Sequence, residues 1–345
     1  MAGNEGHRRR VRYRGTHPRK FSEKYKELSP AEYGPDVQKV VMRGQTPAGT
    51  HRPICVAEIV GILHPQPGET GLDATVGYGG HARCLLAAME GRGKLLAIDA
   101  DPVELAKTER RLRDLGYDAA SLQFHRMNFA GIAKLLSLVP TGFDFVLADL
   151  GVSSMQLDDP ARGFTFKEEG PLDLRMNPLR GEPAAALIRR WSPARLEEVL
   201  RENADEPYAR EIARAIAGAW EPAQTTRQLG ALIVGALAAR KAAVPPAAVS
   251  KSIARTFQAL RIAVNDEFGA LDRFLESLPY CLKPGGRVAI LTFHSGEDRR
   301  VKKSFKQGLL DGRFARIATE PIRPSRQEQF ENPRSCCAKL RWAVR

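Results

Sequence analysis

A glycine-rich stretch in the first third of the chain has the residue types that bind a nucleoside or phosphate group. It reads DATVGYGGH at residues 73–81, with an apolar segment before it and a helical pattern after it. Glycines at 77, 79 and 80 let the backbone turn sharply and approach a ligand with no Cβ in the way. The helix that follows offers unpaired N–H groups to the same ligand. Asp99 ends the next apolar segment, where a carboxylate can accept both hydroxyls of a ribose.

This turn is compatible with two chemistries. Gly77-x-Gly79-x-x-Ala82, with an acid 20 positions after Gly79, satisfies the dinucleotide-binding pattern of an NAD-dependent oxidoreductase. A methyltransferase that binds S-adenosylmethionine on a similar sheet uses the same turn and the same acid. The turn alone leaves both open.

A second carboxylate, Asp149, ends the apolar segment 143–149 and is followed by Gly151 and two serines. An acid at this place can accept a hydrogen bond from an amine and hold its lone pair towards an electrophilic methyl group. An isolated acid at a strand end is more often a turn or helix-capping carboxylate. Methylation of cytosine carbon-5 would require a cysteine nucleophile, and the segment around Asp149 contains none.

The alternation of apolar and helical segments predicts a parallel, doubly wound α/β sheet with ligands at the carboxyl ends of its strands. After residue 155 the strands stop and four helical patterns follow, which predicts an inserted helical subdomain. We expect Asp101 to cap the helix that starts at Pro102, with Glu104 closing a capping box. The expected helices are 53–63, 101–115, 183–191, 193–203, 208–220, 226–241 and 268–281, and the expected strands are one ending near residue 73, then 94–99, 122–126, 143–149, 287–293 and 339–344.

Charge and composition limit the function classes. The formal net charge is +13, and the basic excess lies in residues 1–50 and 287–345 while the body between them is nearly neutral. This distribution favours a polyanionic partner such as RNA over a protein or small-molecule substrate. Five cysteines without a Cys-x-x-Cys pair indicate neither a disulfide framework nor a metal site. No apolar run approaches the roughly 20 residues of a membrane span, so we expect a cytoplasmic protein that does not enter a membrane.

Seven blocks of sequence, in order, resemble the bacterial ribosomal RNA small-subunit methyltransferase H family. The resemblance covers nearly the whole chain after residue 50, and it favours the methyltransferase over the oxidoreductase. The blocks are DATVGYGGH at 73–81, AIDADP at 97–102, DLGVSSMQLD at 149–158, RGFTF at 162–166, GPLDLRM at 170–176, TFQALRI at 256–262 with Val264-Asn265, and FHSGEDR at 293–299.

The resemblance implies a Rossmann-like class I methyltransferase sheet with S-adenosylmethionine as cofactor. It also implies methylation of the exocyclic N4 of a cytidine in the decoding region of 16S ribosomal RNA, by direct transfer and without a metal. Asp149 is the candidate catalytic residue. The implied cofactor-binding residues are Gly79, Gly80 and His81 in the turn, Asp99 on the ribose, Phe129 beside the adenine, and Asp149 and Gln156 near the methionine end.

The implied organisation is a basic, flexible arm at 1–50, a methyltransferase domain at 51–154 and 252–345, and a substrate-recognition insert at 155–251. The partner is small-subunit ribosomal RNA or the 30S subunit, and the sequence does not decide whether the chain forms a homodimer. It also leaves open whether His294 and the basic residues Arg299, Arg300, Lys302 and Lys303 contact RNA. A non-catalytic ribosome-assembly factor remains an alternative.

The sequence departs from the family pattern in three places, and none includes a cofactor residue. Tyr78 stands where the family often has Arg, Gly296 where it has Leu, and Cys336-Cys337 where Arg-Ser is usual. The basic arm is expected to be an addition to the family pattern.

Overall fold

A seven-stranded sheet in the order β3-β2-β1-β4-β5-β7-β6 forms the body of the protein. The computed structural model describes residues 53–345, so the arm expected at 1–50 lies outside the described residues. Strands β3, β2, β1, β4 and β5 are parallel, and β7 is antiparallel to both β5 and β6. The strands are β1 (Thr70–Asp73), β2 (Lys94–Asp99), β3 (Leu122–Arg126), β4 (Phe143–Asp149), β5 (Leu282–Thr292), β6 (Arg316–Ile317) and β7 (Lys339–Val344).

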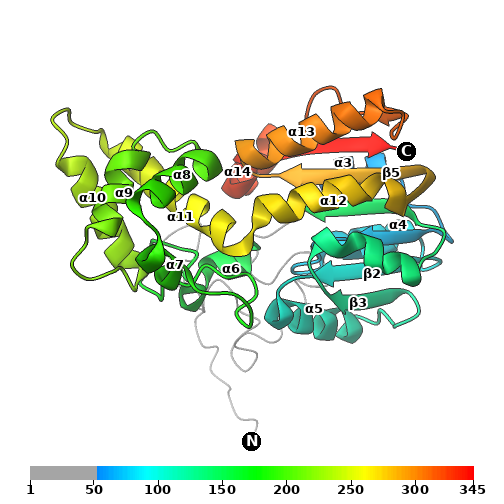
Figure 1. Ribbon diagram of the computed structural model, residues 1–345. Coiled ribbons are helices and arrows are strands. Elements are labelled where there is room, and N and C mark those ends of the chain that lie inside the picture. Colours follow the sequence, from blue (N-terminus) through cyan, green and yellow to red (C-terminus); the bar gives the residue numbers. More distant parts are fainter. Residues whose placement is uncertain (1–52) are drawn as a thin grey trace, which may run out of the picture. The chain divides into compact units, whose positions relative to one another are not determined.

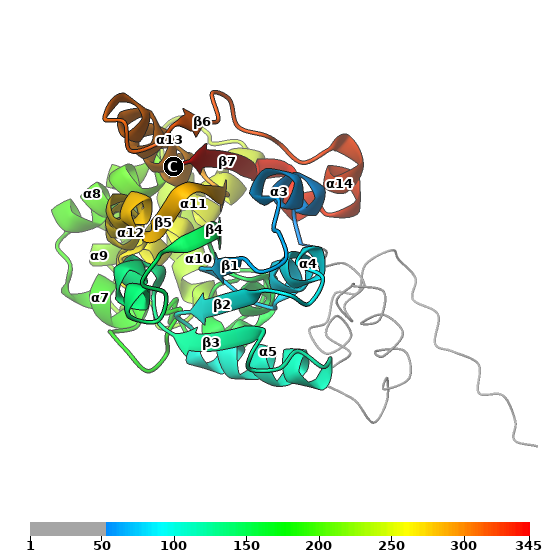
Figure 2. The same ribbon diagram turned by 90° about the vertical axis from the view of Figure 1, so that its right-hand side faces the viewer.

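Helices cover both faces of this sheet, as expected for a doubly wound fold (Figure 2). One face packs on α3 (Val56–Leu63), α4 (Gly80–Ala88) and α5 (Pro102–Asp114), and the other on η2 (Phe129–Ser137), α12 (Glu267–Cys281) and α13 (Ser295–Leu310). Successive residues of β2 alternate between the two cores because side chains of a strand point to opposite faces. Leu96 and Ile98 lie in one core, and Leu95 and Ala97 in the other.

A lobe of helices lies between β4 and β5 in the chain and beside the sheet in space (Figure 1). Its apolar faces form a separate core to which α7 to α11 all contribute, with Leu196, Ile212, Leu229 and Leu260 completely buried. The lobe comprises α6 (Ser154–Asp158), η3 (Pro160–Arg162), α7 (Ala184–Arg190), α8 (Pro193–Ala204), α9 (Ala209–Ala217), α10 (Thr226–Ala238) and α11 (Pro246–Asn265).

Helix α11 was not predicted, and residue 251 lies inside it. Its first residues are Pro-Ala-Ala-Val-Ser-Lys, in which small and polar side chains weaken the apolar period that marks a helix. The chain passes from α11 into α12 through Asp266, which has a φ of 49°. The chain therefore returns from the helical lobe through one sharp turn between two helices, α11 and α12. The short elements β6, α14 (Arg326–Glu331) and η4 (Pro333–Cys337) complete the C-terminal part.

The predicted bounds of β2, β3, β4 and β7 are confirmed to the residue. The prediction that Glu104 closes a capping box at α5 is wrong. Asp101 does cap the helix, accepting from the N–H groups of Val103 and Glu104, but its own N–H donates to the Asp99 carboxylate at 2.9 Å. Because that N–H is already bound, the Glu104 carboxylate pairs with Lys107 instead. Among the described helices, none is both long and apolar enough to cross a membrane.

The glycine turn depends on close packing as well as on backbone conformation. Gly79 caps α4 with a φ of 85°, and a Cβ added there would lie 2.8 Å from Leu112 Cδ1. At Gly80 an added Cβ would lie 2.4 Å from Pro53 Cγ. Gly79 is therefore required by the neighbouring helix α5, and Gly80 by the segment before α3, apart from any ligand.

We expect Gly79→Ala to destabilise the protein more than Gly91→Ala, since Gly91 shares the positive φ (69°) but has open space around it. Backbone strain should cost each variant about 1–2 kcal/mol, and overpacking should cost Gly79→Ala about 1–3 kcal/mol more. Urea unfolding of the two variants measures the difference. Equal losses would show that the contact with Leu112 is relieved without cost.

Candidate cofactor and substrate site

The carboxyl ends of three adjacent parallel strands bring Asp73, Asp99 and Asp149 to one edge of the sheet. Strand β1 lies between β2 and β4, with Asp73 opposite Ala97 on one side and Leu147 on the other. Asp99 and Asp149 are each two residues beyond those partners, at the ends of their strands. The sequence prediction that Asp99 and Asp149 share one edge is confirmed, and Asp73 joins them.

Asp99 is bound to the glycine turn. Its Oδ2 accepts from the Gly77 N–H at 3.0 Å and its Oδ1 from the Asp101 N–H at 2.9 Å. Burial raises the pKa of Asp99 to about 6, against the opposing effect of these two bonds. Each carboxylate oxygen keeps a lone pair for a further donor, such as a ribose hydroxyl.

Asp73 is the functional candidate that sequence reasoning missed. It is 1% exposed, its Oδ1 accepts from the Thr75 N–H at 3.1 Å, and its Oδ2 has no hydrogen bond in residues 53–345. Burial raises its pKa to about 7, and the negative charges of Asp149 and Asp99 contribute while His81 opposes them. Its place at the head of the glycine motif was the available signal.

His81 and Asp149 face each other across the site. His81 Nε2 lies 3.5 Å from Asp149 Oδ2, and the His81 residue is 8% exposed. The backbone N–H of Asp149 donates to Thr75 Oγ1 at 2.6 Å. Within the described part of the chain neither His81 Nε2 nor Asp149 Oδ1 has a hydrogen bond. Because buried polar atoms are normally paired, these atoms fit a site for a polar ligand.

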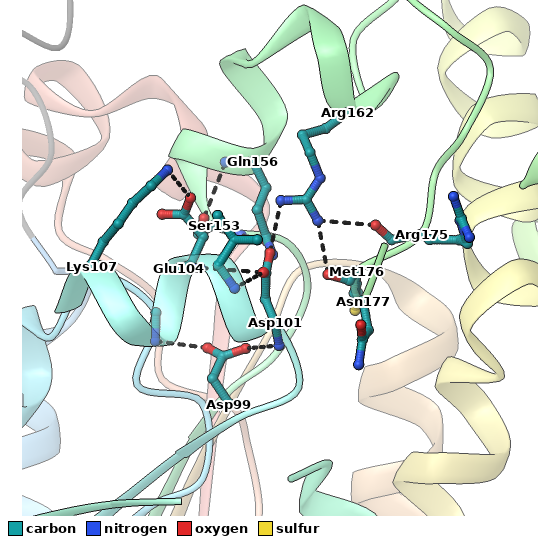
Figure 3. Close-up of polar contacts among 12 residues, drawn as sticks. Asp99, Asp101, Glu104, Lys107, Ser153, Gln156, Arg162, Arg175, Met176 and Asn177 are labelled. Atoms are coloured by element: carbon teal, nitrogen blue, oxygen red, sulfur yellow. Dashed lines mark hydrogen bonds and ion pairs between the residues drawn. The ribbon is translucent and has the colours of Figure 1, made fainter. Parts of the chain in front are cut away.

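The Gln156 side chain makes hydrogen bonds to two other segments of the protein. Its Oε1 accepts from the Ser153 N–H at 2.9 Å, which completes a capping box at α6, and its Nε2 donates to Asp101 Oδ2 at 2.7 Å (Figure 3). The structure thus places Gln156 between α6 and the start of α5. One N–H of its amide is left for a ligand.

Phe129 stands at the start of η2, directly after β3. Its ring packs edge-on against Phe274 with 5.4 Å between the centroids, and the residue is only partly buried. An aromatic ring in this position is held by the core and keeps some of its surface accessible.

His294 caps α13, with its Nδ1 accepting from the Glu297 N–H at 3.4 Å. Its Nε2 lies 3.2 Å from Glu297 Oε1 but makes no hydrogen bond within the described part of the chain. The structure assigns His294 a helix-capping role.

The basic residues of α13 divide into two groups. Arg299 pairs with Asp205, and Arg300 pairs with Asp272 and stacks on Phe268 at 3.7 Å. The second group comprises Lys302, Lys303 and Lys306, which are exposed and have no acidic partner in the described part of the chain.

The structure explains two of the three departures from the family pattern. A Cβ at Gly296 would lie 2.5 Å from Phe268 Cζ, so glycine admits the ring on which Arg300 stacks. Arg111 places its guanidinium 3.5 Å from the centre of the Tyr78 ring, so a cation is present where the family often has Arg. Nothing in the structure explains Cys336-Cys337, which are exposed.

Three features define a class I S-adenosylmethionine-dependent methyltransferase fold. They are the sheet order with antiparallel β7 between β5 and β6, the glycine turn after β1, and the acid at the end of β2. The profile of the MraW methylase family matches residues 48–345, and the chain belongs to that family.

Three curated relatives match most or nearly all of the chain. Ribosomal RNA small subunit methyltransferase H 2 of Alkaliphilus metalliredigens is 52% identical over 99% of this chain and 98% of its own. Methyltransferase H 1 of Lachnoclostridium phytofermentans is 49% identical over 98% of this chain and 93% of its own. The H protein of Thermomicrobium roseum is 40% identical over 86% of this chain and 94% of its own.

These alignments correct one expectation. The basic arm is not an addition to the family, because the first two relatives align with 98–99% of the chain and must include most of it.

The raised pKa of Asp73 predicts an unusual dependence of stability on pH. The folded protein keeps this proton up to about pH 7, whereas the unfolded chain loses it near 3.8. Between these values the unfolded state binds fewer protons, so ionisation of Asp73 lowers the free energy of unfolding as the pH rises. Relative to wild type, Asp73→Asn should gain up to roughly 4 kcal/mol across this window.

Urea unfolding at several values between pH 4.5 and 7.5 tests this. Asp298→Asn is the control, since Arg341 and Lys339 hold the pKa of Asp298 below its ordinary value and its difference from wild type should stay flat in that range. A constant difference for Asp73→Asn as well would contradict the assignment.

Proposed function

We propose that the protein transfers the methyl group of S-adenosylmethionine to the exocyclic N4 of a cytidine in the decoding region of 16S ribosomal RNA. The observation that supports this most directly is the convergence of Asp73, Asp99 and Asp149, with unpaired buried atoms on Asp73, Asp149 and His81, at the edge of a methyltransferase sheet. The family of the chain and the names of its relatives give the substrate class.

The residues present fit the cofactor. Asp99 would accept the ribose hydroxyls, and Phe129 would lie against the adenine. Gly79, Gly80 and His81 would line the turn, while Asp149 and Gln156 would face the methionine end. The bound cofactor supplies an electrophilic methyl group.

Asp149 is the proposed catalytic residue. Its Oδ1 has no partner among the described residues, so it can accept a hydrogen bond from the cytidine amine and keep the nitrogen lone pair directed at the methyl group. The same oxygen can take the proton that the amine loses. His81 can share this proton with the carboxylate, since its Nε2 lies 3.5 Å from Asp149 Oδ2. No covalent intermediate on the protein is required.

The helical lobe, α6 to α11, would recognise the RNA around the target base. A base in a folded RNA must leave its stack to reach the strand ends, so we propose that the cytidine is flipped into the site. The proposed partner is the small ribosomal subunit, and the proposed location is the cytoplasm.

The defining experiment incubates the purified protein with labelled S-adenosylmethionine and small subunits that lack the modification, and then identifies the labelled nucleoside. Label in N4-methylcytidine supports the proposal. Cofactor binding without any label in RNA supports a non-catalytic assembly factor instead. Binding of NADH, detected by its fluorescence, would support the oxidoreductase.

In this assay we expect Asp149→Asn to lower kcat at least about 100-fold, because the amide accepts no proton from the amine. Cofactor binding, measured by equilibrium dialysis, should fall much less. Asp144→Asn is the matched control, since Asp144 lies on the same strand at its other end, paired with Lys283. Full turnover by Asp149→Asn with bound cofactor would exclude the catalytic role.

The unpaired lysines of α13 are proposed to contact RNA phosphates. Replacing Lys302, Lys303 and Lys306 together by Gln should weaken binding to small subunits and reduce the slope of log affinity against log salt by about 2–3, close to one unit for each lost contact. Replacement by Arg preserves the charge and should leave the slope unchanged. An unaltered slope in the Gln variant would place the RNA elsewhere.

A further inference from the structure

A buried carboxylate joins the cofactor side of the site to the helical lobe. Asp101 is 0% exposed, and its Oδ1 caps α5 by accepting from the N–H groups of Val103 and Glu104. Its Oδ2 accepts from Gln156 Nε2 at 2.7 Å and from Arg162 Nη1 at 2.8 Å, as Figure 3 shows. The last two donors come from the first segments of the lobe.

Arg162 extends this connection to a loop. Its Nη2 donates to the backbone oxygens of Arg175 at 3.0 Å and Met176 at 2.8 Å, while Nη1 holds Asp101. The side chain is 13% exposed, so these bonds form largely out of water. A planar guanidinium can bind both sides at once, whereas an ammonium is a single point charge.

The loop at residues 173–177 is held in a strained form. Leu174 has a φ of 63°, in the left-handed region that a branched side chain rarely adopts. Asn265 fixes it from the other side, accepting from the Met176 N–H and donating to the Leu174 oxygen, both at 2.7 Å. Such strain persists only where the surroundings enforce it, and it is concentrated at functional sites.

Asp101 is also bonded directly to the proposed cofactor site. The Asp101 N–H donates to the carboxylate of Asp99, the proposed ribose acceptor. A ligand that fixes Asp99 therefore fixes the turn that carries Asp101, and through Asp101 the guanidinium that holds the loop. The path runs from Asp99 to Asp101 to Arg162 to the loop, with no bond longer than 3.0 Å.

We propose that Arg162 is a positioning residue that couples the two substrates, so that occupation of the cofactor site strengthens binding of RNA by the lobe, and the reverse. This proposal rests on the proposed function, because it requires that the loop at residues 173–177 faces the RNA. Coupling of this kind is reciprocal and is typically about 5- to 150-fold in affinity.

The test measures binding of small subunits lacking the modification by filter retention, with and without saturating S-adenosylhomocysteine, which occupies the cofactor site without turnover. We expect the wild type to bind at least about fivefold more tightly with it, and Arg162→Gln to bind equally with and without it. Arg162→Lys, which keeps the charge but reaches one side at a time, should retain only part of the ratio.

Arg287→Gln is the matched control. Arg287 is another largely buried arginine, with a side chain 18% exposed, and it lies at the opposite edge of the sheet. It joins a carboxylate, Glu69, to the backbone oxygens of Leu63, His64 and Asp144. This variant should lose thermal stability and keep the wild-type ratio, which separates coupling from stability.

A second readout uses no RNA. Hydrogen exchange of the amides in residues 173–177 should slow when S-adenosylhomocysteine binds the wild type and should not change in Arg162→Gln. A wild type without coupling, or an Arg162→Gln protein with the full ratio, would overturn the inference. A wild type that couples but never methylates RNA would instead contradict the proposed function.

Discussion

Repulsion and desolvation among buried carboxylates are the constraint on which the site depends. Asp73, Asp99 and Asp149 end three adjacent strands, and burial is the main reason that the pKa values of Asp73 and Asp99 lie near 7 and 6. An arrangement that holds so many acids together is unfavourable by itself. It persists because the backbone N–H groups of Gly77 and Asp101 bind Asp99, and because His81 lies beside Asp149. A ligand that carries hydroxyls and positive charge would relieve this cost, which gives the proposed cofactor site its physical basis.

The turn after β1 shows how packing and binding share the same residues. Gly79 and Gly80 carry no Cβ because Leu112 and Pro53 occupy that space, so these glycines bring α4 and its neighbours together. Gly77 differs, since an added Cβ would meet nothing closer than 3.8 Å, and its N–H holds Asp99. The conformation that packs the helices is thus also the one that orients the proposed ribose acceptor.

The sheet was predictable because continuous apolar runs such as β2 and β4 are buried on both faces and end in acids that the sequence displays. Two residues of the site, Asp99 and Asp149, were predictable because each ends an apolar strand and matches a motif of the family. Contacts between distant segments were not. Nothing local shows that Asp101 accepts hydrogen bonds from Gln156 and Arg162, which lie 55 and 61 positions away. Nor does it show that the Asp101 N–H, expected to donate to Glu104, donates to Asp99 instead. Asp73 was missed because its unusual state comes from complete burial, which tertiary packing alone decides.

The helical lobe raises a mechanical problem that the buried polar network addresses. The lobe has a core of its own and leaves the sheet after β4 and returns through the turn at Asp266, so the covalent chain allows it to move as a unit. Methyl transfer requires the acceptor nitrogen to be held at short range and in line with the methyl group. Apolar contact between lobe and sheet would tolerate sliding, whereas the bonds of Asp101 with Gln156 and Arg162 have fixed lengths and directions. Asp101 is two residues after Asp99 in the chain. The orientation of the lobe therefore depends on the same segment that is proposed to bind the cofactor.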